Sequence, residues 1–300
     1  MSVPVSSDTT ALHHAADSLA AVSHVAGEHN MFAELLHHVQ DSNELEIPFG
    51  HVSLPQFDPF MIAGISFDMS ITKHVVFLWI SAALLLLFAV LAAGRNRRSA
   101  VPTGFGNLVE IFIVFIRDEI VLPNMGTAGL RYVPYLLTTF FFILIMNLAG
   151  LVPYGATATG NVSVTAGLAI IAFFVIQASA IRAQGMGHYL AHLTGGVHWI
   201  LWPIMIPIEI LGLFTKPFAL CIRLFANMTG GHIVIVALFG LIFIFKSYFI
   251  AVGPFAFILG ILMLEIFVAF LQAYIFTMLT ALFMGLGIQA AEAHSEEGHA

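Results

Sequence analysis

The chain has 300 residues, of which 59% are hydrophobic and only 9% are charged, and its mean hydropathy is +0.96. Soluble domains carry about 25% charged residues, so this composition excludes a water-soluble enzyme, a disordered chain and a nucleic-acid-binding protein. A single cysteine, Cys221, excludes an internal disulfide and a CxxC metal site. The composition therefore predicts an integral membrane protein whose surroundings are the lipid bilayer.

The first 72 residues form an acidic tail with nine acidic residues and no lysine or arginine. Because the first basic residue is Lys73, the N-terminus lacks the charged region of a signal or transit peptide, and we expect the tail to be retained. A short amphipathic helix is predicted at 32–40 and a turn at 57–60. Seven histidines lie in the tail without the spacing of a ligand motif, which favours a solvated segment over a metal site.

Apolar runs of about 20 residues are long enough to cross a bilayer as helices. Such runs lie near 74–94, 132–151 and 164–181, and two much longer ones follow near 203–245 and 255–290. The segment 108–122 mixes charged residues with Ile and Phe, which predicts a helix along the membrane interface. The sequence thus predicts an all-α membrane protein with about five transmembrane helices, an interfacial amphipathic helix and a long, inclined C-terminal helix hairpin.

The charge distribution predicts how the chain is oriented. We divide it into the tail (1–72), a membrane domain (73–290) and an acidic C-terminus (291–300). If the spans alternate, six arginines between 95 and 182 fall on one side, whereas Lys73 and Lys246 fall on the other. The positive-inside rule then places the tail outside and the C-terminus inside. With no transit peptide, we expect a bacterial plasma membrane.

Polar residues interrupt the two longest apolar runs. They are Glu209, Lys216, Arg223, Asn227 and His232 in the first, and Glu265 and Gln272 in the second. At 100° per residue, the first four lie within about 80° of one another and form one polar stripe. Ionisable residues inside a membrane are functional candidates, although a solvated polar face is the alternative interpretation.

Arg223 is the most informative of these residues. An arginine cannot release its proton in a protein, so inside a bilayer it needs an anionic partner. We expect Arg223 to lie level with Gln272, and His232 level with Glu265 farther out, if the helices fold back over 246–254. Because this register places no carboxylate level with Arg223, we predict that its partner is an acid from another chain. Snorkelling of Arg223 toward water is the alternative.

Two stretches, LFTKPFALCIRLFANMTGGHIV (213–234) and EIFVAFLQAYIFTML (265–279), resemble subunit a of the F-type ATP synthase, and the similarity covers roughly residues 70–290. The resemblance implies a stationary, proton-translocating subunit with two half-channels. In it, Arg223 would face the carboxylates of a ring of c subunits. His232 and Glu265 would line the outer half-channel and Glu209 the inner one, with Asn227, Gln272 and Lys216 as polar lining.

The same resemblance implies partners and excludes some chemistry. The expected partners are the c-subunit ring, the peripheral-stalk b subunits, the rest of the ATP synthase and the lipid bilayer, with no nucleic acid, cofactor or metal. No GxxxxGK[ST] motif is present, so we predict that this chain itself performs no ATP chemistry. A self-contained ion transporter and a structural scaffold are the alternatives. The first lacks an acid level with Arg223, and the second leaves the polar stripe unexplained.

Overall fold

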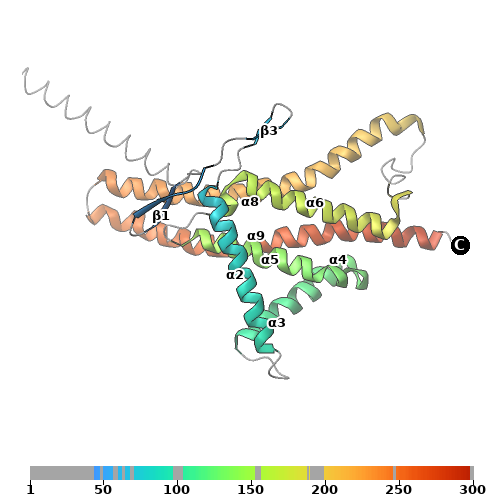
Figure 1. Ribbon diagram of the computed structural model, residues 1–300, viewed down its shortest axis with the longest axis horizontal. Helices are drawn as coiled ribbons and strands as arrows, with labels where there is room; N and C mark the ends of the chain where they lie inside the picture. Colours follow the sequence, from blue (N-terminus) through green and yellow to red (C-terminus); the bar gives the residue numbers. More distant parts are fainter. Residues whose placement is uncertain are drawn as a thin grey trace, which may run out of the picture. The chain divides into compact units, whose positions relative to one another are not determined.

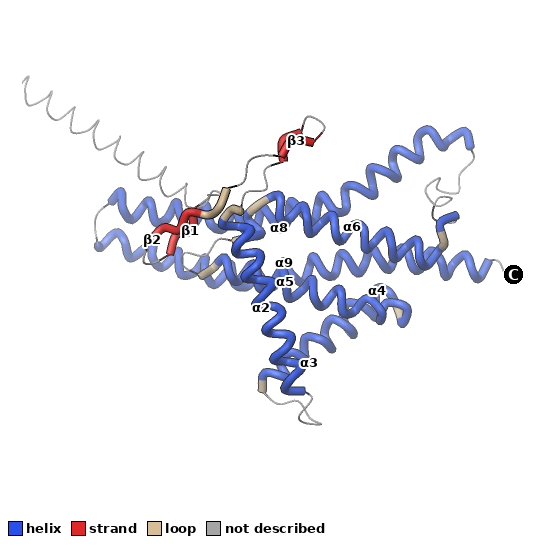
Figure 2. Tube along the Cα trace, viewed as in Figure 1, coloured by secondary structure: helices blue, strands red, loops and turns tan. Residues whose placement is uncertain are grey.

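The structure is a computed structural model that describes residues 44–47, 50–56, 60–62, 65–67, 71–96, 104–152, 157–187, 189, 199–245 and 248–297. Helices dominate the fold, and two short antiparallel hairpins lie in the tail (Figures 1 and 2). The hairpins pair β1 (Glu44–Ile47) with β2 (Gly50–Ser53) and β3 (Phe60–Ile62) with β4 (Ile65–Phe67). The helix predicted at 32–40 and the turn predicted around Pro59 fall outside the described residues.

The predicted all-α membrane architecture is confirmed. Five helices in the described part of the chain are long and apolar enough to cross a membrane. They are α2 (Lys73–Asn96), α5 (Val133–Gly150) with the preceding 3-10 helix η2 (Thr127–Tyr132), α6 (Val162–Gln184), α8 (Trp202–Phe245) and α9 (Tyr248–Glu297). Helices suit such apolar sequences because lipid offers no hydrogen bonds, so every backbone group must be satisfied within its own segment.

The helix α9 begins earlier than the sequence predicted. We expected a connection over 246–254, but the helix starts at Tyr248 and contains Pro254. A proline lacks one N–H donor, yet the long apolar context keeps the remaining backbone helical. With 44 and 50 residues, α8 and α9 measure about 66 Å and 75 Å along their axes, roughly twice the thickness of a hydrocarbon core.

The segment predicted to lie along the interface is helical and has three parts. These are α3 (Phe105–Phe115), the π-helical turn η1 (Ile116–Val121) and α4 (Leu122–Met125). In η1, Ile116, Ile120 and Val121 are fully buried, whereas Arg117 is exposed. The helical conformation predicted for this segment is therefore confirmed, with ends that extend slightly beyond 108–122. Its position at a membrane interface remains a prediction.

The chain divides into two compact units. Of the described residues, the larger unit contains those within 42–229 and 263–297, and the smaller contains those within 230–262. The core of the larger unit joins side chains from η1, α5, α8 and α9, and its largest fully buried members include Ile116, Phe140, Leu220, Leu224 and Phe276. Figure 1 shows α5, α6 and the later part of α9 running together, whereas α2 crosses them steeply.

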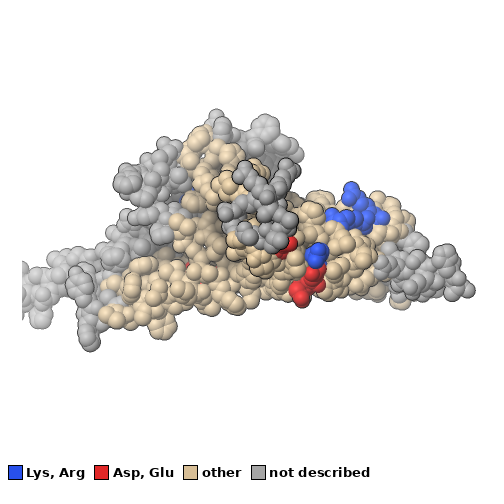
Figure 3. Space-filling view, turned by 90° about the horizontal axis from the view of Figure 1, so that it is seen from below, with Lys and Arg blue, Asp and Glu red and all other residues tan. Residues whose placement is uncertain are grey.

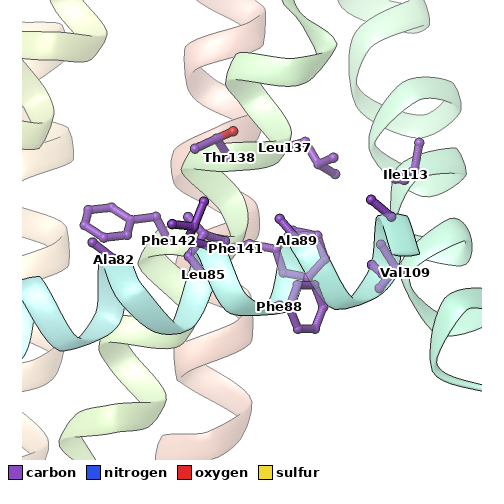
Figure 4. A pocket seen from close by; sticks show the side chains of 13 residues that line it. Ala82, Leu85, Phe88, Ala89, Val109, Ile113, Leu137, Thr138, Phe141 and Phe142 are labelled. Atoms are coloured by element: carbon purple, nitrogen blue, oxygen red, sulfur yellow. The ribbon is translucent and has the colours of Figure 1, made fainter. Parts of the chain in front are cut away.

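An apolar cavity of about 660 Å³ lies between α2, α3 and α5 (Figure 4). Leu85, Phe88, Ile113 and Phe141 are among the side chains that line it. Its one hydroxyl group, that of Thr138, already donates to the carbonyl of Pro134 at 2.8 Å. The cavity therefore offers no polar group to an ion or a proton, and the ionisable residues lie elsewhere.

Close backbone contacts fix the last turns of α9 in the larger unit. A Cβ atom at Gly285 would overlap the backbone carbonyl of Asn124, and one at Gly287 would lie 2.7 Å from the Cβ of Ala180. The Gln184 side chain also donates to the carbonyl of Gly287 at 2.7 Å. Glycine at these positions therefore allows α9 to approach α4 and α6, as small residues do between membrane helices.

We predict that Gly285→Ala destabilises the protein. A backbone carbonyl cannot turn aside as a side chain can, so we expect the overpacking to cost about 1–3 kcal/mol. The measurement is the thermal unfolding midpoint of the detergent-solubilised protein. Gly167→Ala on α6 is the matched control, because nothing lies within 4 Å of its Cβ position. Equal midpoints for both variants would show that the contact at Gly285 is not tight.

Candidate functional site

The polar side chains of α8 and α9 meet at one hydrogen bond. The amide nitrogen of Asn227 donates to the side-chain oxygen of Gln272 at 2.8 Å. Gln272 is only 2% exposed, so the bond satisfies a polar group that is surrounded by apolar neighbours. A hydrogen bond between membrane helices contributes about 1 kcal/mol, so its main effect is to orient the two helices.

This hydrogen bond corrects the predicted register of the hairpin. Asn227, and not Arg223, lies level with Gln272, which shifts the pairing by four residues or about 6 Å. A second contact agrees, because the ammonium of Lys216 lies 5.0 Å from the ring centroid of Phe283. The predicted register was wrong because helical periodicity gives the face on which a polar residue lies but not the polar neighbour that it contacts.

Arg223 lies on the open side of α8. The buried face of this helix carries Leu220, Leu224 and Met228, and Arg223 is about 100° around the helix from Leu224. Arg223 itself is exposed, as are the small residues Ala219 and Ala226 beside it. No described residue forms an ion pair or a hydrogen bond with the Arg223 side chain. The structure therefore leaves room for another helix to approach this guanidinium closely.

Arg117 shows the contrasting arrangement outside the spans. Its guanidinium donates two hydrogen bonds to Asp118, at 2.7 Å and 3.1 Å. The pairing holds the pKa of the Asp118 carboxyl below its usual value. Both side chains are exposed, so solvent screens the pair and its contribution to stability is small. On the face shown in Figure 3, charged side chains gather over one part of the described surface and leave most of it uncharged.

The negative charge of Glu209 acts on a pair of polar side chains that was not predicted from the sequence. The hydroxyl of Tyr189 donates to the side-chain oxygen of Gln177 at 2.6 Å. Burial raises the pKa of the Tyr189 hydroxyl, and the negative charge of Glu209 raises it further. Tyr189 and Gln177 therefore form a polar pair within electrostatic range of Glu209. The signal for it was Gln177, a polar amide within the apolar run at 164–181.

The face of α9 that carries Glu265 and Gln272 is buried. Glu265 is 6% exposed, and the two residues are seven positions apart, which confirms that they share one helix face. The same buried face of α9 also carries Ala269, Ala273 and Phe276. His232 is half-buried and belongs to the smaller unit. Its pairing with Glu265 stays a prediction.

Five long apolar helices, of which α8 and α9 carry ionisable side chains within their apolar runs, define a multi-pass membrane protein of the kind that moves ions. Residues 75–285 match the family model of the ATP synthase A chain. The chain therefore belongs to the ATP synthase A chain family.

Individual relatives agree with this assignment. The chain is 54% identical over 270 residues to an ATP synthase subunit a from Chloroherpeton thalassium, a match that covers 89% of this chain and 79% of the relative. It is 52% identical over 272 residues to an ATP synthase subunit a 2 from Chlorobaculum tepidum, covering 88% and 75%. An ATP synthase subunit a from Myxococcus xanthus is 52% identical over 234 residues, covering 77% of each chain.

We predict that cysteine cross-linking will follow the observed register. On a background that lacks Cys221, cysteines at Asn227 and Gln272 should form a disulfide more readily than cysteines at Asn227 and Val268. The second pair is displaced by about 6 Å along α9. Disulfide yield is measured by gel shift after mild oxidation of membranes. Preferential cross-linking of the second pair would contradict the observed register and support the one in which Arg223 is level with Gln272.

Proposed function

We propose how this chain, the proton-translocating stator subunit of an ATP synthase, carries protons past a rotating ring. Arg223 faces a ring of small subunits, each of which brings one membrane carboxylate to it. The observation that carries this proposal is the position of Arg223 on the open face of α8, beside Ala219 and Ala226. A guanidinium in lipid costs roughly 3 kcal/mol or more, and an approaching carboxylate offsets that cost.

The chemistry of Arg223 determines its role. A positive charge close to a carboxyl group favours the ionised form of that group. Arg223 therefore makes each arriving ring carboxyl release its proton before it passes. Because arginine does not deprotonate, it cannot hand a proton from one side to the other. The same charge thus drives the release and prevents a leak between the two half-channels.

Protons reach the ring from outside and leave it toward the inside. Glu265 and His232 deliver the proton that neutralises a ring carboxylate, which can then enter the lipid as the ring turns. After nearly a full rotation, the proton leaves near Glu209, where Tyr189 and Gln177 add hydrogen-bonding groups. The bond between Asn227 and Gln272 holds α8 against α9, so the outer and inner groups keep fixed positions around Arg223.

The remaining assignments concern the surroundings of the chain. The tail (1–72) lies outside, the membrane domain is 73–290, and the C-terminus (291–300) lies inside a bacterial plasma membrane. The c-subunit ring and the b subunits are its partners, and ATP is made or hydrolysed by other chains of the complex. A self-contained transporter would instead move protons when this chain alone is placed in liposomes.

We predict that Arg223→Ala lowers ATP-driven proton pumping at least about a hundredfold, since losing a group that stabilises a developing charge costs about that much. Arg223→Lys should also be largely inactive, because a desolvated lysine can lose its proton. Acidification of inverted membrane vesicles is the measurement. Arg117→Ala, which removes an exposed arginine outside the spans, is the matched control and should pump normally. Normal pumping by Arg223→Ala would contradict the proposed role.

The outer pair gives an independent prediction. We expect His232→Glu and Glu265→His each to impair pumping and synthesis, because the first sets two acids together and the second two bases. The double exchange restores one group of each kind and should recover a measurable part of the activity. Activities are compared at matched expression of the four proteins. A double variant no better than the worse single variant would show that the two residues are not an interchangeable proton relay.

A further inference from the structure

A second group of buried polar side chains lies where α2, α5 and the turn before α6 meet. It consists of His74, Asn147, Thr157 and Thr159, which are all 5% exposed or less. His74 is in the first turn of α2, Asn147 in the last turns of α5, and Thr159 in the 3-10 helix η3 (Ala158–Gly160). Neither the apolar periodicity nor the polar stripe of α8 accounts for them.

Two hydrogen bonds hold these residues in two pairs, and the short turn from Thr157 to Thr159 brings the pairs close together. Nδ1 of His74 lies 3.0 Å from the backbone carbonyl of Thr157, and the hydroxyl of Thr159 donates to the side-chain oxygen of Asn147 at 2.8 Å. The turn is pressed against α5, because a Cβ atom at Gly150 would overlap the Thr157 side chain. His74 is thereby held against the turn that carries Thr159.

The group extends to the helix that bears Glu265. The amide nitrogen of Asn147 donates to the backbone carbonyl of Ala269 at 3.3 Å. Ala269 follows Glu265 by four residues, so it lies one turn or about 6 Å farther along α9. Buried hydrogen-bonding groups therefore extend from the first turn of α2 to within one helical turn of Glu265.

Only one member of this group can take up and release a proton near neutral pH. It is His74, because threonine and asparagine do not titrate. The carbonyl of Thr157 can only accept a hydrogen bond, so Nδ1 carries the proton of the neutral ring. Nε2 is then the nitrogen that takes up a further proton. Among the side chains that the structure describes, the other charged groups on the packed elements are Lys73 on α2 itself, Glu265 on α9, and Glu110 on α3 at the opposite end of α2. The described residues of η3 and the second half of α5 carry none.

We propose that His74 is the entry residue of the outer half-channel: its imidazole takes a proton from outside water at Nε2 and releases it, through water held by Thr159 and Asn147, toward the carboxylate of Glu265. This inference rests on the proposed function and on the tail lying outside. It adds a proton-accepting residue on α2, a helix that supplied none of the site residues predicted from the sequence. His74 acts at the mouth of the path, whereas Glu265 acts beside the ring.

The test uses the intact ATP synthase in liposomes, inserted so that the outer face of this chain contacts the liposome lumen. ATP synthesis is measured at a constant proton-motive force while the lumen pH is varied from about 5.5 to 7.5, the range in which a histidine titrates. His74→Gln keeps a side-chain donor for the Thr157 carbonyl but cannot titrate. We expect the rate of ATP synthesis by His74→Gln to fall about tenfold, which is less than the full effect of removing a proton-transfer group. The loss is smaller because water also reaches the outer end of the proton path. The dependence on lumen pH should flatten as well.

Two further variants separate proton transfer from a structural role. Imidazole in the lumen should restore part of the activity of His74→Ala, since it supplies the missing base. Ser81→Ala, at another buried polar position on α2, should behave as the wild type, because the Ser81 hydroxyl has no hydrogen-bond partner among the described residues. ATP hydrolysis by the purified complexes shows that each variant is assembled.

The outcomes distinguish a failure of this inference from a failure of the proposed function on which it rests. Wild-type rates for His74→Gln, or reduced rates with an unchanged lumen-pH profile and no rescue by imidazole, would give His74 a structural role and overturn the inference. Arg223→Ala is measured in the same liposomes. If Arg223→Ala is inactive while His74→Gln is normal, the proposed function stands and only the entry residue is rejected. If Arg223→Ala is active, the proposed function itself fails.

Discussion

A permanent positive charge on the open face of an apolar helix is the constraint on which the rest of this structure depends. Arg223 cannot become neutral, and within the described chain no carboxylate pairs with it. The cost of holding it in lipid is offset only when an anion approaches from outside the chain. The small neighbours Ala219 and Ala226 permit that approach, because they let another backbone come close. In the proposed function, each ring carboxylate that passes Arg223 is then stabilised only transiently.

The proposed function also requires that the groups around Arg223 stay in place while a neighbouring subunit moves past. Two specific contacts supply this rigidity, the amide pair of Asn227 and Gln272 and the approach of Lys216 to Phe283. Both give α8 and α9 the same register. Farther along α9, Gly285 and Gly287 bring the helix against α4 and α6. The fixed side of the site is thus held by side-chain pairing at its centre and by close backbone packing at one end.

Much of this arrangement could be predicted from the sequence, because lipid leaves few alternatives. Apolar runs specify helices, and the bounds predicted for α2, α6 and α8 agree with the structure to within a few residues. The start of α9 was missed because Pro254 suggested a break, and proline in fact costs the helix only one hydrogen bond. The register was missed because helical periodicity gives the face of a residue but not the neighbour that it contacts.

The buried polar residues outside α8 and α9 were harder to predict for a related reason. A lone His74 at the start of an apolar run, or Asn147 near the end of one, looks like an ordinary helix end. Only the tertiary contacts bring His74 to the Thr157 carbonyl and Asn147 to the Ala269 carbonyl. Such contacts join residues more than 80 positions apart, and no local pattern contains them.

Cross-linking across the open face of α8 in the intact complex tests the central claim most directly. On a background without Cys221, a cysteine at the exposed Ala226 should form a disulfide with a cysteine placed next to the membrane carboxylate of a ring subunit. A cysteine at Ala273, which is buried on α9, should not. The account predicts an adduct at Ala226 alone. No adduct at Ala226, or an equal adduct at Ala273, would show that Arg223 does not face the ring.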